Sequence, residues 1–262
     1  EHRLDMVLPY VDAVWSIRAG KISGVHDKEA YLSCQSEYIR DECGTPSIGE
    51  SGPIFQLEHT GFSVNGREIL KDISFTVKKG ERVLLLGENG CGKTTLLRLI
   101  ARLCRPSKGR ILQGVDPSFG QKAKGSEDWF KKVGIVYQNP NYQLFMPTVE
   151  QEIGFGASSQ NAAREVMELF GLTSLAHRHP HSLSEGQKRR VSIAAVAASS
   201  PSVLLLDEPT VGQDYAGLKD MIHILNRLHE QTGNTMITIT HDMRCAEALC
   251  DHAVRIENGV VV

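Results

Sequence analysis

The first candidate site is a glycine-rich loop at residues 87–95, which reads Gly-Glu-Asn-Gly-Cys-Gly-Lys-Thr-Thr. Glycines let the backbone curl until consecutive N–H groups point at phosphate oxygens, and the start of a following helix adds positive potential. This spacing is the P-loop pattern, in which Lys93 reaches the outer phosphates of a nucleotide and the Thr94 hydroxyl binds Mg²⁺. The other expected phosphate contacts come from the same loop: Gly87, Asn89, Gly90, Cys91, Gly92 and Thr95.

A second candidate site follows an apolar run at residues 204–208, Leu-Leu-Leu-Asp-Glu. A carboxylate at the end of a buried strand can hold Mg²⁺, and the next carboxylate can polarise an attacking water. Apolar runs often end in Asp as a helix or turn cap, so the pattern is weak by itself. Because a P-loop precedes it in the same chain, we expect Asp207 to bind the metal ion and Glu208 to activate the water.

These residues need strands and helices to position them. Strands are predicted by alternation or by short apolar runs at residues 54–57, 73–77, 82–86, 133–137, 203–206 and 236–240. Helical patterns cover residues 96–103, 149–170, 185–198 and 218–229. Asn258-Gly259 predicts a tight turn in a closing hairpin. Strand and helix alternate, so we expect an α/β core with a largely helical insertion.

Composition narrows the classes of protein to which the chain can belong. Of its 262 residues, 41% are hydrophobic and 23% are charged, which argues for a buried core and against global disorder. The net charge of −2 disfavours a nucleic-acid binder, which needs clustered positive charge. The most apolar stretch, residues 191–206, is broken by serines and Pro201, so no bilayer-spanning segment is predicted. The six cysteines lack metal-ligand spacing, and we expect free thiols.

Five further landmarks accompany the two sites. Residues 183–187, Leu-Ser-Glu-Gly-Gln, resemble the signature motif of ABC ATPases. The remaining four resemble that family's Q-loop, D-loop, switch histidine and adenine-stacking aromatic: Gln138, Gln213-Asp214, Thr240-His241-Asp242 and Phe62. Their order across residues 54–262 is specific to the family. The resemblance implies a P-loop NTPase core with a mixed, mainly parallel sheet, an antiparallel β edge and a helical signature subdomain at about residues 140–200.

The resemblance also implies how the site works. In ABC ATPases, the P-loop of one domain and the signature of another sandwich one ATP, so ATP and Mg²⁺ are the implied cofactors. The partner is a second ABC ATPase domain, fused or separate, arranged head to tail. Glu208 is implied as general base, His241 as the residue that holds the γ-phosphate, and Gln138 as a sensor of Mg²⁺ and water. The residues implied to reach the partner's nucleotide are Ser184, Gly186, Gln187 and Asp214.

The segment that begins at Gln138 narrows the resemblance. Residues 138–145 and 147–156 look like the corresponding segment of energy-coupling factor and cobalt-type importers, in which two ATPase domains drive a transmembrane coupling protein. This implies an ATP-hydrolysing motor at the inner face of the cell membrane that powers import of a vitamin, vitamin precursor or metal ion. The alternatives are a soluble ABC-type ATPase that acts on ribosomes, DNA or protein complexes, and a regulatory nucleotide-binding module.

Several positions depart from the family pattern. Glu185 replaces the first of two signature glycines, and it either points to solvent at a helix start or weakens the composite site. Gln213 stands where leucine is common. Asn141-Tyr142 replaces residues that are often acidic, which changes the expected fit to a basic motif of the coupling protein.

Residues 1–22 repeat the end of the chain at an offset of 239 positions. The matched pairs are His2 with His241, Asp12 with Asp251, Ile17 with Ile256 and Gly20 with Gly259. An ungapped repeat predicts that residues 1–22 are the C-terminal remnant of a preceding ABC ATPase domain. Residues 23–53 are then a linker and residues 54–262 a second ATPase domain, so the chain is expected to be the second half of a duplicated importer ATPase.

Three remaining features have two interpretations each. His177, His179 and His181 form either a metal-binding tract or an ordinary polar loop. The run Lys-Arg-Arg at residues 188–190 is expected on the solvated or partner-facing side of the signature helix, with nucleic-acid binding as the disfavoured alternative. Cys91 is either a reactive thiol inside the phosphate cradle or a small filler.

Overall fold

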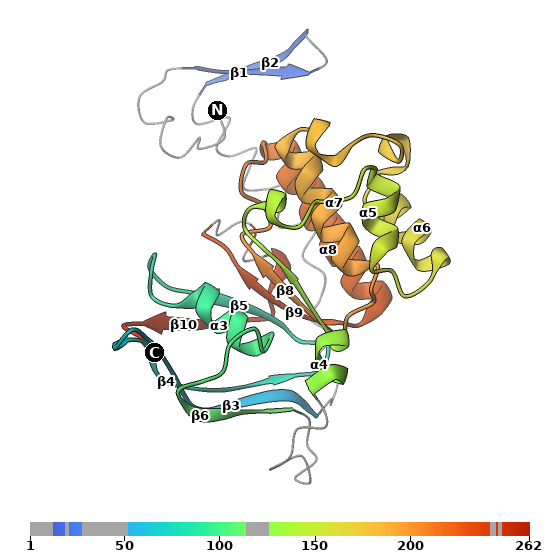
Figure 1. Cartoon of the computed structure of the whole chain (residues 1–262). Coiled ribbons are helices and arrows are strands. Elements are labelled where there is room, and N and C mark those ends of the chain that lie inside the picture. The colour runs from blue at the N-terminus through green and yellow to red at the C-terminus, as the bar shows by residue number, and fades with distance from the viewer. Residues whose placement is uncertain (1–12, 19–20, 28–51, 114–125, 242–244, 246–247) are drawn as a thin grey trace.

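The computed structural model describes residues 13–18, 21–27, 52–113, 126–241, 245 and 248–262. Within these residues, a nine-stranded sheet has the order β6-β3-β4-β11-β10-β5-β9-β8-β7 (Figure 1). Its strands are β3 (Pro53–Val64), β4 (Arg67–Lys78), β5 (Arg82–Leu86), β6 (Lys108–Gln113), β7 (Val133–Val136), β8 (Val203–Asp207), β9 (Thr235–Ile239), β10 (His252–Glu257) and β11 (Val260–Val261). The helices are α3 (Lys93–Ile100), α4 (Ser126–Lys132), α5 (Val149–Phe155), α6 (Gln160–Leu169), α7 (Glu185–Ala197) and α8 (Tyr215–Thr232).

The sheet combines a parallel part with an antiparallel part. Strands β10, β5, β9, β8 and β7 pair in parallel, whereas β3 pairs antiparallel with both β4 and β6. In Figure 1 the strands β3, β4 and β6 form a layer below α3, and the parallel strands lie on its other side. The expected α/β core with a mainly parallel sheet and an antiparallel edge is therefore confirmed.

Alternate residues of the parallel strands enter two different cores. Leu205 and Ile237 pack in a core with the apolar face of α3, which includes Leu96. Leu204 and Met236, on the opposite face, pack in a core with the apolar residues of α7 and α8. Because side chains in a strand alternate between faces, a run buried on both sides must be continuously apolar, as the sequence predicted.

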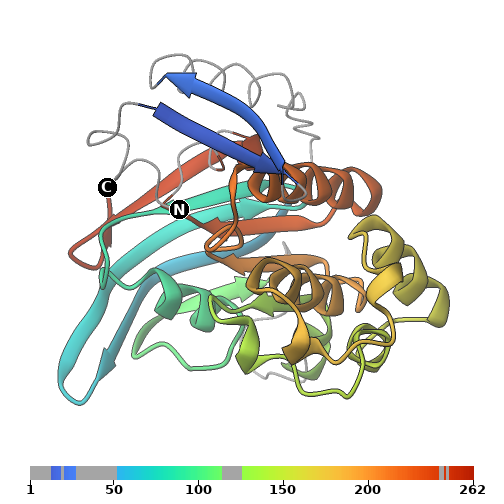
Figure 2. The same ribbon diagram turned by 90° about the horizontal axis from the view of Figure 1, so that it is seen from above.

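Three helices form the expected helical subdomain beside the sheet (Figures 1 and 2). Each has an N-cap side chain that accepts a hydrogen bond from the backbone of its first turn: Thr148 for α5, Ser159 for α6 and Ser184 for α7. Short 3₁₀ turns connect them, namely η3 (Pro140–Tyr142), η4 (Thr173–Leu175) and η5 (Pro180–Ser182). The single pattern expected at residues 149–170 is in fact two helices, because α5 ends at Phe155.

Two other boundaries differ from expectation. The apolar face predicted to extend to Leu103 stops earlier, because α3 ends at Ile100 and Leu103 is half-exposed beyond it. The closing hairpin is confirmed between β10 and β11. Asn258 and Gly259 both have positive φ there, 50° and 81°, which is the backbone that a tight two-residue turn requires.

A separate hairpin precedes the sheet. Strand β1 (Ala13–Arg18) pairs antiparallel with β2 (Lys21–Asp27). The pairing of β2 with β1 extends to Asp27. Strand β2 therefore continues past residue 22, where the boundary between domain remnant and linker was expected. Shifted by 239 positions, β1 coincides with the whole of β10, and Lys21 coincides with Val260 at the start of β11. Residues 1–12 and most of the expected linker, 28–51, lie outside the described residues.

Candidate functional site

Four neighbouring parallel strands end beside one another at a single edge of the sheet. Val136 of β7 pairs with Leu206 of β8, and Leu85 of β5 pairs with Ile239 of β9. The predicted site residues lie at the last position of a strand or one or two positions beyond it: Gln138, Asp207, Glu208, His241 and Gly87. Ligands of open α/β sheets bind outside the carboxyl ends of the strands, so this edge is the candidate site.

The glycine-rich loop connects β5 to α3 and is shaped by its glycines. Gly87 and Gly92 have φ of 146° and 107°. A Cβ on Gly87 would lie 2.6 Å from the Cys91 Sγ, and a Cβ on Gly92 would lie 2.6 Å from the Leu70 Cδ2. Helix α3 begins at Lys93, so its first N–H groups open toward the loop. The loop therefore has the closely approached backbone and the helix terminus that an anion site needs.

Lys93 is buried inside this loop. Its Nζ donates hydrogen bonds to the backbone oxygens of Gly87, at 2.6 Å, and Glu88, at 2.9 Å. A phosphate oxygen would offer the ammonium a charged acceptor in place of a neutral carbonyl, and charge-assisted hydrogen bonds are the stronger ones. Around it, Asn89 and Gly90 are exposed and Cys91 and Thr95 are half-buried.

Thr94 and Asp207 form a pair suited to Mg²⁺. The Thr94 hydroxyl donates to Asp207 Oδ2 at 2.9 Å. Burial raises the pKa of the Asp207 carboxyl, and the Thr94 hydrogen bond and the Lys93 charge oppose that rise. Both side chains offer the hard oxygen atoms that Mg²⁺ prefers. Gln138 is exposed, and within the described residues no hydrogen bond joins it to either member of the pair.

Glu208 is a buried carboxylate beside His241. Its oxygen Oε1 lies 3.3 Å from His241 Nε2, and Oε2 accepts a 3.4 Å hydrogen bond from the His241 backbone N–H. Burial raises the pKa of Glu208, and the nearby His241 opposes that rise. Oε1 is buried and has no hydrogen bond of good geometry from any described residue. Glu208 also has φ 52°, a strained backbone of the kind found at active sites.

The signature residues lie at the first turn of α7. Ser184 is exposed and caps the helix, and its side chain and that of Gln187 bond each other's backbone in a capping box. Glu185 forms a 2.7 Å ion pair with Lys188 at the exposed helix start. The Glu185 carboxylate is therefore directed along its own helix, toward Lys188.

The D-loop residues pack against the signature helix. Asp214 caps α8 by accepting a hydrogen bond from the Gly217 N–H at 2.7 Å. The Gln213 amide lies next to Gly186 and Gly217. A Cβ added to Gly186 would lie 3.5 Å from Gln213 Oε1, and a Cβ added to Gly217 would lie closer still. Gln213 Nε2 is buried without a hydrogen-bond partner among the described residues. Gln213, which stands where leucine is common in the family, is therefore in close contact with the signature helix.

A single residue, Leu70, lies between Phe62 and the P-loop. On β3 it pairs with Leu70 of β4, whose side chain fills the space beside Gly92. Phe62 is half-buried at the rim of the core that contains α3. Its position is consistent with a base-stacking residue, which stays a prediction.

Sequence reasoning missed a buried cation on α7. The run at residues 188–190 was expected on a solvated or partner-facing side, which fits Lys188 and Arg190, since they pair with the exposed carboxylates of Glu185 and Asp220. Arg189 is 5% exposed, and its Nη1 donates to the Tyr137 backbone oxygen at 3.4 Å. The helical spacing could have identified it, because buried Ile193 and Ala197 follow it at intervals of four.

Two side chains of the Q-loop region were missed as well. Gln143 accepts from the Tyr137 N–H at 2.9 Å and donates to the Ile135 oxygen at 2.8 Å. Glu152 is buried, and one of its oxygens accepts the N–H groups of Phe145 and Met146, at 2.8 and 2.7 Å. These bonds shape the segment that follows Gln138. No sequence signal distinguishes such internal contacts from exposed polar residues.

The histidine tract makes contacts within its own loop and with the segment that follows Gln138. His179 Nδ1 accepts from the His181 backbone N–H at 3.2 Å, and His181 Nε2 lies 3.0 Å from the Leu144 oxygen. Within the described ranges, no group of three or more candidate ligands could hold a metal ion. No helix in the same ranges is long and apolar enough to cross a bilayer.

A strand, a P-loop and a helix, with an acidic pair at the end of an adjacent strand, define a P-loop nucleoside triphosphatase, and a capped signature helix defines the cassette type. Residues 70–211 match the family model described as ABC transporter. The chain belongs to this family, as the motifs predicted, and family membership makes it an ATPase.

Particular relatives narrow the family. The chain is 37% identical over 201 residues to the energy-coupling factor transporter ATP-binding protein EcfA of Methanoculleus marisnigri, covering 74% of this chain and 72% of that protein. It is 38% identical over 207 residues to the putative HMP/thiamine import ATP-binding protein YkoD of Bacillus subtilis, covering 78% of this chain but 37% of that protein. The structure of cbiO1 from Clostridium perfringens, part of the transporter complex cbiONQ, aligns with TM-score 0.70 and 33% identity over 80% of this chain and 87% of that one.

Proposed function

We propose that this chain is the ATP-hydrolysing motor subunit of a membrane importer for a small solute such as a vitamin, a vitamin precursor or a metal ion. The observation that carries the proposal is a complete P-loop and Glu208–His241 site in the same chain as an exposed aromatic groove on the helical subdomain. The names of the relatives, which include energy-coupling factor and thiamine import proteins, support the same class of function.

The chemistry follows from the positions of the side chains. A water beside the Glu208 carboxylate would attack the γ-phosphorus while the carboxylate accepts its proton, and the bond to the β-phosphate oxygen breaks to give ADP and phosphate. Lys93 would stabilise the charge on the outer phosphates, and His241 would orient the γ-phosphate. Thr94, Asp207 and Gln138 would hold Mg²⁺, which supplies further charge stabilisation to the phosphates. Most of the rate enhancement then comes from positioning and electrostatics.

A second ATPase domain is needed to complete the site. The signature residues Ser184 and Gly186 begin α7 in the helical subdomain, and no described contact joins them to the chain's own P-loop. A head-to-tail partner would bring its own signature to Lys93 while this chain's Ser184 reaches the partner's nucleotide. Asp214 and Gln187, at the same surface, would support that contact.

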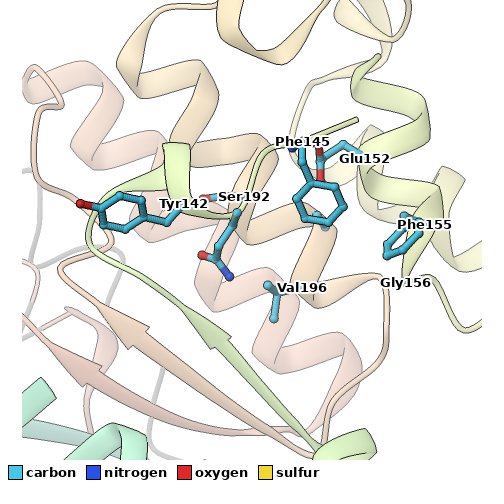
Figure 3. Close-up of a pocket in the computed structure, with 9 residues that line it drawn as sticks. Tyr142, Phe145, Glu152, Phe155, Gly156, Ser192 and Val196 are labelled. Atoms are coloured by element: carbon cyan, nitrogen blue, oxygen red, sulfur yellow. Dashed lines mark hydrogen bonds between the residues drawn. The ribbon is translucent and has the colours of Figure 1, made fainter. Parts of the chain in front are cut away.

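The groove is the proposed contact with a transmembrane coupling protein. Its cavity volume is ≈ 230 Å³, and it lies between the Q-loop segment, α5 and α7 (Figure 3). Phe145 and Phe155 are 65% and 69% exposed and meet edge to face at 5.6 Å, while Tyr142 is 78% exposed. Exposed aromatic clusters of this kind mark interaction sites. We therefore place the subunit in the cytoplasm, at the inner face of the membrane.

Membrane association of the groove variants tests this function. We expect the wild-type chain to sediment with membranes from its own cells, and Phe145→Asp to move into the soluble fraction while it still binds ATP. Phe130→Asp is the matched control, because Phe130 is half-exposed but does not line the groove. Sedimentation of the wild type with ribosomes after detergent treatment would instead support a soluble ABC-type ATPase.

We also propose that the partner domain precedes this one in the same polypeptide. The sequence repeat at offset 239 and the coincidence of hairpin β1–β2 with β10–β11 support this arrangement. The match to little more than a third of YkoD is compatible with a relative of double length. Mass spectrometry of the natural protein, captured through residues 54–262, should find peptides of a second P-loop in the same polypeptide. A natural polypeptide with a single P-loop would contradict the proposal.

A further inference from the structure

The backbone of Tyr137, the residue directly before Gln138, is held at both its N–H and its C=O. On one side, the Tyr137 N–H donates to Gln143 Oε1 at 2.9 Å. On the other side, the Tyr137 carbonyl oxygen accepts from Arg189 Nη1 at 3.4 Å. Tyr137 follows the last residue of β7, so these two bonds fix the backbone where the strand ends and the Q-loop begins.

The two side chains that hold the Tyr137 backbone come from different functional surfaces. Gln143 lines the groove proposed for the coupling protein. Arg189 lies on α7, whose first turn carries Ser184 and whose Ser192 also lines the groove. The Tyr137 backbone therefore connects the groove, the signature helix and Gln138.

Burial of the Arg189 guanidinium at this position costs folding free energy. It is 5% exposed, and burial lowers the pKa of its guanidinium, although the negative charges of Glu185, Glu208 and Asp207 oppose that change. Its Nε has no hydrogen-bond partner among the described residues. A buried charge with an unpaired donor destabilises a fold relative to an apolar side chain of the same size. Such a residue is better explained by a role in function than by stability.

We propose that Arg189 is a positioning residue that ties the Tyr137–Gln138 backbone to the signature helix. An occupant of the groove that displaces Gln143 or α7 then moves Gln138 and Ser184 together, which adjusts two composite sites in one step. The inference deepens the proposed function and rests on it, because it concerns how groove occupancy reaches the site of ATP hydrolysis.

A double-mutant cycle with Gln138 tests the proposal in the full chain, purified with whatever ATPase partner accompanies it. Arg189→Met and Gln138→Ala are each expected to lower kcat about tenfold. If Arg189 acts through Gln138, the double variant should be no slower than Gln138→Ala by itself, since groups that act as a unit are not additive. If the two losses multiply, so that kcat of the double variant falls about a hundredfold, the proposal is overturned.

Matched controls separate this role from a structural one. Arg190→Met removes the adjacent arginine, which pairs with exposed Asp220, and should leave kcat unchanged. The thermal midpoint of Arg189→Met should not fall below that of Arg190→Met by more than a few degrees. If Arg189→Met fails to fold, Gln143→Met loosens the Tyr137 backbone from the groove side and should show the same non-additivity with Gln138→Ala.

The outcomes also distinguish this inference from the proposed function. If the wild-type preparation hydrolyses no ATP, the proposed function fails. If the wild type is active and sediments with membranes, but Arg189→Met and Gln143→Met both multiply with Gln138→Ala, only the positioning role fails.

Discussion

The Thr94 hydroxyl donates a 2.9 Å hydrogen bond to Asp207 Oδ2, across 113 residues of sequence. One partner lies in the first turn of α3 and the other at the end of β8, so the bond joins the P-loop to the acidic pair. The two oxygen atoms that we propose as Mg²⁺ ligands are therefore held next to each other by the fold.

Replacement of Thr94 by valine should separate metal-dependent from metal-independent binding. Thr94→Val removes the hydroxyl but keeps the β-branched shape, so we expect ATP affinity with Mg²⁺ to fall roughly tenfold or more. Affinity in the presence of EDTA should change little, because Lys93 and the loop amides remain. Titration of a fluorescent ATP analogue measures both values, and Thr76→Val, on the exposed part of β4, serves as control.

Glu208→Gln should bind ATP but hydrolyse it slowly. A general base contributes roughly 10²–10⁴-fold to such reactions, and glutamine cannot accept the proton from water. We expect kcat to fall within that range while ATP affinity is retained. Phosphate release under saturating ATP is the measurement, with Glu257→Gln on the surface of β10 as control. Unchanged hydrolysis would instead favour a regulatory nucleotide-binding module.

The stability of the ligand-free protein should depend on pH through Glu208. Because burial raises its pKa, the folded state keeps this proton at pH values where the unfolded chain has lost it. The free energy of unfolding therefore falls as pH rises from the ordinary glutamate pKa to the raised one. Glu208→Gln lacks this loss, so its stability should match the wild type in acid and exceed it at neutral pH. Chemical denaturation in EDTA at several pH values tests the sign, and a constant difference would contradict it.

Gln213→Leu should stabilise the fold. The Gln213 Nε2 donor is buried without a partner among the described residues, and an unsatisfied buried donor costs about 1–3 kcal/mol. Leucine has a similar size and no polar atom, so we expect a gain of about 1 kcal/mol in the free energy of unfolding. Denaturant titration measures the change, and an unchanged or lower free energy of unfolding would contradict the prediction.

Alkylation of Cys91 should block nucleotide binding. Its Sγ lies 3.9 Å from Lys93 Nζ inside the phosphate loop, so an added group would occupy the space of a phosphate. ATP should protect the thiol from maleimide, and Cys91→Ser should bind ATP while resisting inactivation. Peptide mass spectrometry with and without ATP measures the protection. Equal labelling in both samples would show that Cys91 is a filler.

Local chemistry explains what the sequence predicted. The strand–loop–helix around Gly87 depends on glycine backbone freedom and apolar runs, both of which are local properties. The same holds for the continuous apolar strand before Asp207 and for the Asn258-Gly259 turn. The tandem repeat at offset 239 is likewise visible from residue identities, and the hairpins supply a structural parallel for it.

Only the tertiary structure decided which polar side chains are buried and with what. Arg189 and Arg190 are neighbours of the same type, yet one lies in the core against Tyr137 and the other pairs with Asp220 at the surface. Gln143 and Glu152 bond backbone groups that lie six to eight residues away, and Gln213 lies against a neighbouring helix. A sequence pattern records the periodicity of one element, whereas these contacts arise where two elements pack, so their partners are defined only once the chain has folded.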